Sequence, residues 1–287
     1  PPPPPPPPPP TTPPPPPPPN TIRSSSAASD VYKRQIDSLP GIRIKKDDTF
    51  NFRCHPEVSC FNRCCRNLNL FLYPYDVVRL KQGLNLTSDE FLDDYVDVVL
   101  RPASFFPEVL LRMTRTPEKN CPFLTDSGCS VYPDRPDTCR NFPIEQGMLY
   151  DAQKKKDTPV YFFRPPDFCR GPDEKKEWTI AEWSRDQEAE LYHKMTLRWA
   201  EVQWMFQDDP WGLEGPEGSK AKMAFMATYN VDRFRDFTFQ SSFLKRYKVK
   251  SALLKKLTTD DVQLLKFGFE WVKLFIWGIK SPNIRMR

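Results

Sequence analysis

Short apolar or alternating runs in the middle of the chain predict brief strands. They occur at residues 67–72, 109–113 and 159–163. Residues 121–132 read as a tight β excursion, and Asp126-Ser127-Gly128 supplies its turn. The pattern therefore favours small sheets.

Start and stop signals predict short helices between these strands. Pro74 suits the first turn of a helix over 74–81, and Gly83 suits its exit. The segment 87–96 offers a Thr or Ser cap and early acids that complement the helix dipole. A further helical turn begins at 135–139.

Longer helices are predicted towards the C-terminus. Thr179 and Glu182 form a capping box that opens one helix running to about Phe206. The expected fold class is α+β, with a small irregular cysteine-cluster domain of short helices and β excursions followed by a mainly helical C-terminal region. Later helices are predicted over 220–229, 232–239 and from a cap at 259–261 to about Trp277, with Gly278 and Pro282 as stop signals.

Composition divides the chain into three parts. Residues 1–35 are a proline tract followed by a stretch that looks like a translated sequencing adapter, so we exclude them from the fold as non-native and expect the native N-terminus to be missing. A natural proline-rich linker is the alternative. Residues 36–172 are predicted to form the cysteine-cluster domain, and 173–287 its helical C-terminal extension.

The charge balance is mild. Residues 36–287 hold 39 basic and 36 acidic residues, a net charge of +3, which gives no clear nucleic-acid signal. They contain no apolar run long enough to cross a bilayer, so there is no clear membrane signal either. The ten glycines argue against a glycine-rich nucleotide-binding architecture.

All eight cysteines fall between residues 54 and 169, which indicates a shared role. Thiolate sulfur is a soft ligand that prefers zinc, copper(I) or iron–sulfur clusters, so we predict a metal site. The candidate metal ligands are Cys54, Cys60, Cys64, Cys65, Cys121, Cys129, Cys139 and Cys169.

The spacing of the cysteines carries further information. Cys60 and Cys64 have a separation common in structural zinc sites. Cys64 and Cys65 are adjacent, so both can bind one metal only on a sharply bent backbone; the alternatives are two nearby sites or a multinuclear cluster. Thiolates around a metal need cationic or N–H partners. Arginines stand beside the cysteines at Arg53, Arg63, Arg66, Arg135, Arg140 and Arg170.

Other roles for the cysteines are open. An even number of cysteines suits disulfides, but disulfide frameworks are typical of short chains with small cores. Buried free thiols are a further alternative, against which stand the polar, turn-rich surroundings of Cys129 and the Cys64–Cys65 pair. His55 is an alternative ligand beside Cys54, whereas His193 lies in the middle of a predicted helix and is expected to be structural.

The order of several motif pieces resembles a known family. These pieces are Cys60-x3-Cys64-Cys65-Arg66, Asp76 with Arg79-Leu80, Cys121-Pro122-Phe123-Leu124, Gly128-Cys129, Val131-Tyr132, Arg135-Pro136, and Cys139-Arg140 with Phe142-Pro143. They resemble the YkgJ-like cysteine-cluster family of zinc- or iron-chelating proteins, of the CxxCxxCC type. The resemblance covers about residues 52–170, and the helical region resembles the C-terminal extension of longer bacterial members.

The resemblance implies a cysteine-rich metal or iron–sulfur site in a bacterial, cytoplasmic protein, without a settled activity. An export signal on the missing N-terminus is the alternative location. Cys54 and Cys169 would close the site or hold a second one. The inner ligand set implied by the family motif is Cys60, Cys64, Cys65, Cys121, Cys129 and Cys139.

The predicted function is metal binding through a Cys-thiolate zinc or iron site, with the activity unknown and enzyme status open. The cofactor is a zinc ion or an iron–sulfur cluster. The alternative is an iron–sulfur redox protein or oxidoreductase component, although the chain has no C-x2-C pair of the ferredoxin kind. A modification enzyme is a third hypothesis, because similar cysteine clusters occur in flagellin lysine methylases.

Two features of the C-terminal region have alternative interpretations. Basic residues at 245–256 are interleaved with apolar ones, which favours a solvated face over phosphate binding. Residues 267–277 are strongly apolar and read as a core helix; a protein partner or membrane-surface contact is the alternative.

Overall fold

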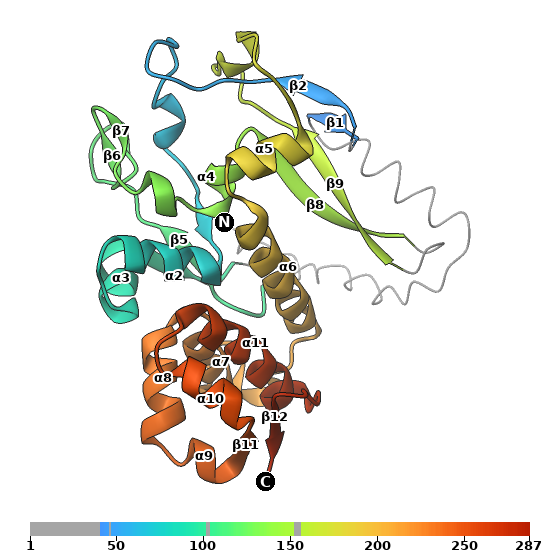
Figure 1. The fold of residues 1–287 in the computed structure, drawn as a ribbon. Coiled ribbons are helices and arrows are strands. Elements are labelled where there is room, and N and C mark those ends of the chain that lie inside the picture. The colour runs from blue at the N-terminus through green and yellow to red at the C-terminus, as the bar shows by residue number, and fades with distance from the viewer. Residues whose placement is uncertain (1–40, 46, 102–103, 152–155) are drawn as a thin grey trace, which may run out of the picture. The chain divides into compact units, whose positions relative to one another are not determined.

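The computed structural model describes residues 41–45, 47–101, 104–151 and 156–287 (Figure 1). The predicted non-native segment 1–35 lies outside the described residues. The chain divides into two compact units. One contains residues 148–159 and the other contains 41–147 and 160–287. The description below concerns the second, with strands β8 and β9 given at their full length although each also includes residues of the first.

Small sheets form the first part of this unit. In one, β1 (Ile42–Ile44) pairs antiparallel with β9 (Lys156–Phe163), and β9 neighbours β8 (Ile144–Asp151). In another, β2 (Thr49–Asn51) pairs with β10 (Glu177–Thr179). The lead-in to the cysteines is therefore held by β9, which precedes the last cysteine, and by β10, which follows it.

A second three-stranded sheet contains the strands that precede and follow the first two helices. Its order is β3 (Phe71–Leu72), β5 (Glu108–Leu111) and β4 (Val96–Val99), all antiparallel. The predicted helices are confirmed as α2 (Pro74–Gly83) and α3 (Ser88–Tyr95), with Thr87 capping α3.

The turn-rich cysteine segments form short elements. They are the 3₁₀ turn η1 (Arg63–Cys65), the hairpin β6 (Leu124–Thr125) and β7 (Gly128–Cys129), the 3₁₀ turn η2 (Tyr132–Asp134), α4 (Asp137–Asn141) and the 3₁₀ turn η3 (Gly171–Asp173). The predicted β excursion over 121–132 is confirmed by the β6–β7 pairing.

The single helix predicted from Thr179 to Phe206 is wrong. The structure divides it into α5 (Ile180–Asp186) and α6 (Glu190–Met205). Glu188 has a φ of 52° at the break, and the carbonyl of Gln187 accepts a hydrogen bond of 2.6 Å from Arg140. Tertiary contacts to this carbonyl therefore stabilise a break that helical spacing does not reveal.

The C-terminal region is helical, as predicted. The apolar segment 267–277 lies in α11, which packs against α7 and α8, so it forms a core helix. The elements after α6 are, in order, η4 (Phe206–Asp208), η5 (Gly212–Glu214), α7 (Ser219–Tyr229), α8 (Val231–Gln240), α9 (Phe243–Arg246), β11 (Tyr247–Val249), α10 (Ser251–Leu257), α11 (Asp261–Trp277) and β12 (Ile284–Met286).

Two apolar clusters form the core. The larger cluster runs from Leu70 to Ile284, and the smaller one gathers Phe52, Ile144 and Trp183 with their neighbours. The fold is therefore α+β with a helical C-terminal region. Within the described residues, no helix is both long and apolar enough to span a membrane.

Candidate metal centre

A sharp bend brings the adjacent cysteines together. Asn62 adopts a left-handed conformation, with a φ of 63°, and η1 then places Cys64 and Cys65 on one tight turn. Their Sγ atoms are 4.0 Å apart. This is the bent backbone that a shared metal requires of neighbouring cysteines.

The backbone joins this turn to the second set of cysteines. The N–H of Cys121 donates a hydrogen bond of 2.8 Å to the carbonyl of Cys65. Beyond it, Cys129 pairs with Leu124 across the β6–β7 hairpin. A contact between residues 56 positions apart therefore places the hairpin cysteines beside η1.

Cys139 reaches this group from α4. The N–H of Asp137, at the start of α4, donates a hydrogen bond of 2.8 Å to the buried Asp76 carboxyl. Cys139 is accessible to solvent, yet protein surrounds its thiol on most sides. This burial is the main cause of its raised pKa, followed by the Cys121 thiol, the Asp76 carboxyl and the Cys129 thiol.

The last cysteine lies beside the first ones. The N–H of Arg170 donates to the Cys60 Sγ over 3.1 Å, and the thiol of Cys169 interacts with that of Cys60. Burial, with repulsion from Cys64, Cys60 and Cys169, raises the pKa of the Cys54 thiol to about 11. Cys54, Cys60 and Cys169 therefore form one neighbourhood.

The mutual electrostatic effects divide the thiols into two groups. The first group is Cys54, Cys60 and Cys169, and the second group is Cys121, Cys129 and Cys139. Cys64 raises the pKa of thiols in both groups, so it lies between them. Burial, Cys129 and Cys64 raise the pKa of Cys121 to about 11, against the effect of the Phe123 N–H.

Backbone N–H groups supply the partners that thiolates need. The N–H groups of Phe123, Val131 and Gly171 each bond to the cysteine two residues before them and lower the pKa of that thiol. Among the arginines singled out from the sequence, Arg135 also lowers the pKa of Cys129. Arg140 instead binds the Gln187 and Pro133 carbonyls, so it supports the surrounding chain.

The eight thiols are the ligand type that a soft metal prefers, and the Cys64 and Cys65 sulfurs are close enough to approach one metal ion. All eight thiols are free. In the described ranges, no three Cys, His, Asp or Glu side chains are grouped closely enough to hold a metal ion. Metal binding would therefore have to draw the remaining thiols towards the Cys64–Cys65 pair.

The two histidines differ in their surroundings. His55 lies beside the first group, with its Nε2 3.4 Å from a carboxylate oxygen of Glu174. His193 lies away from the cysteines and its Nε2 is 2.6 Å from the Gln146 side-chain nitrogen. His193 thus has a partner of its own on the neighbouring strand β8.

Sequence reasoning missed a buried polar cluster under α4. Asp76 and Asp137 are both buried, and Asp137 accepts hydrogen bonds from Asn141 and Thr196. Arg140 is 2% exposed and stacks on the Tyr192 ring. The signal available in the sequence was Asp76 at the third position of a helix opened by Pro74, which marks a capping residue.

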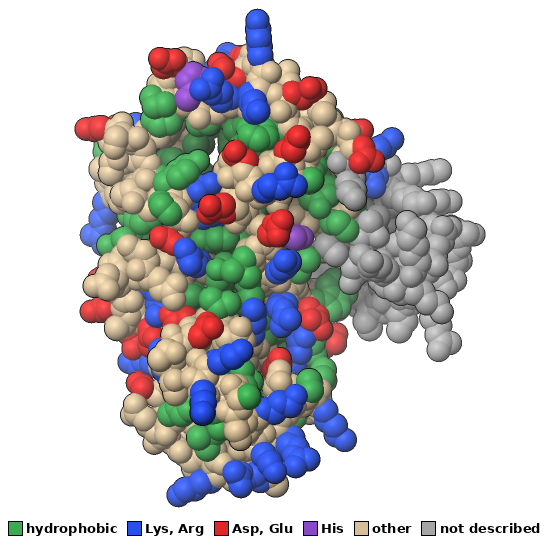
Figure 2. Space-filling model, viewed as in Figure 1, with side chains coloured by type: hydrophobic (Ala, Val, Ile, Leu, Met, Phe, Trp, Pro, Cys, Tyr) green, Lys and Arg blue, Asp and Glu red, His purple; other side chains and the backbone are tan. Residues whose placement is uncertain are grey.

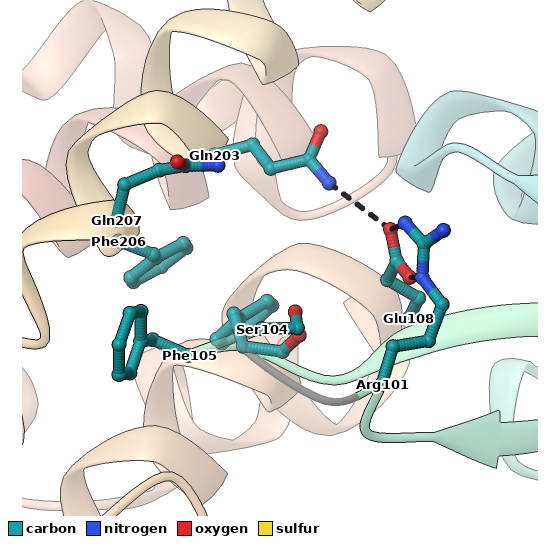
Figure 3. Close-up of a pocket in the computed structure, with 8 residues that line it drawn as sticks. Arg101, Ser104, Phe105, Glu108, Gln203, Phe206 and Gln207 are labelled. Atoms are coloured by element: carbon teal, nitrogen blue, oxygen red, sulfur yellow. Dashed lines mark hydrogen bonds and ion pairs between the residues drawn. The ribbon is translucent and has the colours of Figure 1, made fainter. Parts of the chain in front are cut away.

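A separate cavity of about 420 Å³ lies between the β4–β5 connection and the end of α6 (Figure 3). Arg101 lines it and pairs with Glu108, which also accepts a 3.5 Å hydrogen bond from Gln203. No cysteine is among its lining residues in the described chain. Its charged groups satisfy each other, so it is distinct from the thiol groups and offers no free ligand set.

Comparison with known proteins identifies the cysteine region. Residues 53–184 match the family model CxxCxxCC, whose description is "putative zinc- or iron-chelating domain". No curated protein and no solved structure matches the chain. The matched range contains all eight cysteines and ends within α5. Residues 53–184 of the chain are therefore similar to the CxxCxxCC domain, in agreement with the resemblance seen in the sequence.

Proposed function

We propose that the chain binds zinc or iron through the thiolates of its eight cysteines. The observation that carries the proposal is the 4.0 Å separation of the Cys64 and Cys65 Sγ atoms. Two sulfurs bound to one tetrahedral zinc at about 2.3 Å lie about 3.8 Å apart. A small shift would thus let both sulfurs bind one ion.

The grouping of the thiols supports two metal positions that share the η1 turn. Cys54, Cys60 and Cys169 would hold one ion, and Cys121, Cys129 and Cys139 the other. The Cys64 thiol raises the pKa of Cys54 in the first group and of Cys121 in the second. The Cys65 carbonyl accepts a hydrogen bond from the N–H of Cys121, which ties Cys65 to the second group. A binuclear thiolate site with Cys64 between the metals is the arrangement that we propose.

The chain's own contribution is to supply and stabilise thiolates. Burial raises the pKa of Cys54 and Cys121, so these thiols are protonated at neutral pH until a metal displaces the proton. The N–H groups of Phe123, Val131 and Gly171 then stabilise the sulfur charge. When bound, zinc would cross-link the turns, and iron would add redox chemistry.

The test is to purify the full chain without air, measure zinc, iron and labile sulfide, and record the absorption spectrum. Stoichiometric zinc or iron without sulfide supports the thiolate-ion proposal. A brown protein with iron and sulfide would replace it with the iron–sulfur alternative. Cysteines paired as disulfides, or a protein that binds neither metal, would contradict both.

Single Cys→Ser variants test the arrangement. We expect Cys64→Ser to lose more metal than Cys169→Ser or Cys129→Ser, because Cys64 lies between the two groups. Because site binding energy is folding energy, the Tm should fall by roughly 5–10 °C. Metal analysis and thermal melts give the two readouts.

His193→Gln is the matched control, because His193 is a metal-ligand residue type that lies away from the cysteines. It should keep its full metal content. Equal metal loss in Cys64→Ser, Cys169→Ser and Cys129→Ser would argue for one site, and no loss in Cys64→Ser would remove Cys64 from the metal ligands.

A further inference from the structure

Positive charge is concentrated at the C-terminal end of the chain. Residues 241–287 contain eleven Lys and Arg and three Asp and Glu, a net charge of +8. The whole chain has a net charge of +5, so the other residues carry −3. Such an asymmetry indicates a charged partner. Figure 2 shows Lys and Arg side chains along the edge where α9, β11 and β12 lie in Figure 1.

The three acids of this region are already engaged in the fold. Asp260 caps α11 by accepting from the N–H of Gln263, and Asp261 is buried against Lys81 and Arg235. Glu270 accepts hydrogen bonds from Ser281 and Asn283. Among the described residues, none of these three acids forms an ion pair with an exposed cation of the region, which keeps its net charge of +8.

Five of these cations lie on the β11–β12 ribbon or at its ends. Lys248 lies directly opposite Arg285, and the N–H of Arg287 bonds to the carbonyl of Arg246. Arg246 ends α9, Lys250 directly follows β11 with its N–H bonded to the carbonyl of Asn283, and Arg287 follows β12, so these three lie at the ends of the ribbon. All five side chains are exposed. We call this set the basic face; it comprises Arg246, Lys248, Lys250, Arg285 and Arg287.

The other face of the ribbon packs against the core, except at the exposed Met286. Tyr247, Val249 and Ile284 are buried, and the Tyr247 ring contacts Trp271. Core packing thus fixes the register and holds Lys248 against Arg285. Like charges directly opposite each other destabilise a strand pair. Within the described part of the chain, the basic-face side chains form no ion pair.

We propose that the basic face binds the phosphate backbone of a nucleic-acid duplex without reading its sequence. Cations two residues apart on a strand are about 6.8 Å apart, which is twice the rise of about 3.4 Å per phosphate along one DNA strand. The face has no aromatic side chain for base stacking. The one exposed apolar side chain of the ribbon's described strands, Met286, lies opposite Tyr247 and not among the cations, so a membrane fits less well.

The test measures binding of the full chain to a fluorescent random-sequence DNA duplex by anisotropy. With five phosphate contacts, the affinity should fall about 500-fold between 50 and 200 mM salt. The double variant Lys248→Gln/Arg285→Gln should bind at least tenfold more weakly at 50 mM salt, and its affinity should fall only about 40-fold over the same range.

The matched control is Lys194→Gln/Arg198→Gln, which removes the same charge from exposed positions on α6. It should bind like the parent chain. Metal content and circular dichroism confirm that both variants are folded. Equal weakening in both double variants, no duplex binding, or binding only to vesicles rich in anionic lipid would overturn the proposal. Because the ribbon contains no cysteine, failure of this test leaves the metal proposal intact.

Discussion

Asp76 joins two helix starts through one buried carboxyl. Its Oδ2 accepts the N–H of Tyr73 and its Oδ1 accepts the N–H of Asp137, each over 2.8 Å. Because Asp137 opens the helix that carries Cys139, this carboxyl positions a proposed metal ligand that it does not touch. Burial, and then the nearby Asp137, raise the pKa of Asp76 to about 8.

The raised pKa predicts a pH dependence of stability. The folded state holds the Asp76 proton more tightly than the unfolded state, whose pKa is near 3.8, so stability is lost as pH rises from about 4 to about 8. Asp76→Asn leaves one N–H unsatisfied and should lower the free energy of unfolding by about 1–3 kcal/mol at pH 5. This difference should shrink towards pH 8, because only the parent chain titrates.

Urea unfolding followed by circular dichroism at pH 5, 6.5 and 8 measures the effect. Asp94→Asn makes the same chemical change at an exposed position of α3 and should leave stability within about 0.5 kcal/mol. A constant difference between the parent chain and Asp76→Asn across this range would show that Asp76 does not titrate as described.

At the scale of the elements, α7 and α11 approach closely enough for their backbones to touch. A Cβ on Gly268 would overlap the carbonyl oxygen of Ala227. Backbone cannot yield as a flexible side chain can, so Gly268→Ala should separate the helices and destabilise the fold by about 1–3 kcal/mol. Gly147→Ala is the control, since its Cβ meets Val160 at 3.4 Å. Thermal melts in which both variants behave alike would contradict this account.

Local signals predicted the elements that local chemistry determines. Pro74 with Gly83, the Thr87 cap, and the Asp260 cap with Gly278 each mark a helix end in the structure. The break between α5 and α6 could not be predicted, because it depends on Arg140 reaching the Gln187 carbonyl from another element.

The candidate site shows the same limit. The sequence supplied the eight cysteines and the need for a bent backbone at Cys64–Cys65. It did not supply their grouping, which depends on the bond between Cys121 and Cys65 and on Arg170 beside Cys60. The matched family range extends to residue 184, beyond the predicted boundary at 172/173, which stays a prediction.

At the scale of the whole described unit, a buried ion cluster joins α2 to the C-terminal helices. The Lys81 Nζ lies 3.0 Å from an Asp232 oxygen and 2.9 Å from an Asp261 oxygen, and Arg235 pairs with both acids. Burial acts to raise the pKa of each acid. Hydrogen bonds from Ser88 and Lys81 to Asp232, and from Lys81 and Arg235 to Asp261, nevertheless lower both pKa values.

Lys81→Met tests how much this ion cluster contributes to stability and whether the unit unfolds in a single cooperative transition. Removing a buried cation from two acids should cost about 2–4 kcal/mol, at the low end for a buried pair because Asp232 is partly exposed. Lowered folded pKa values give stability that is present above the unfolded pKa and lost as pH falls, so the stability difference between the parent chain and Lys81→Met should shrink as pH falls below about 4. Lys194→Met, which removes an exposed partner 3.9 Å from Glu190, should change stability by less than about 0.5 kcal/mol.

Because the larger core runs from Leu70 to Ile284, metal release and loss of helical signal should coincide in one urea transition in the parent chain and in Lys81→Met. Two separate transitions would instead show that the cysteine region and the helical region are independent domains.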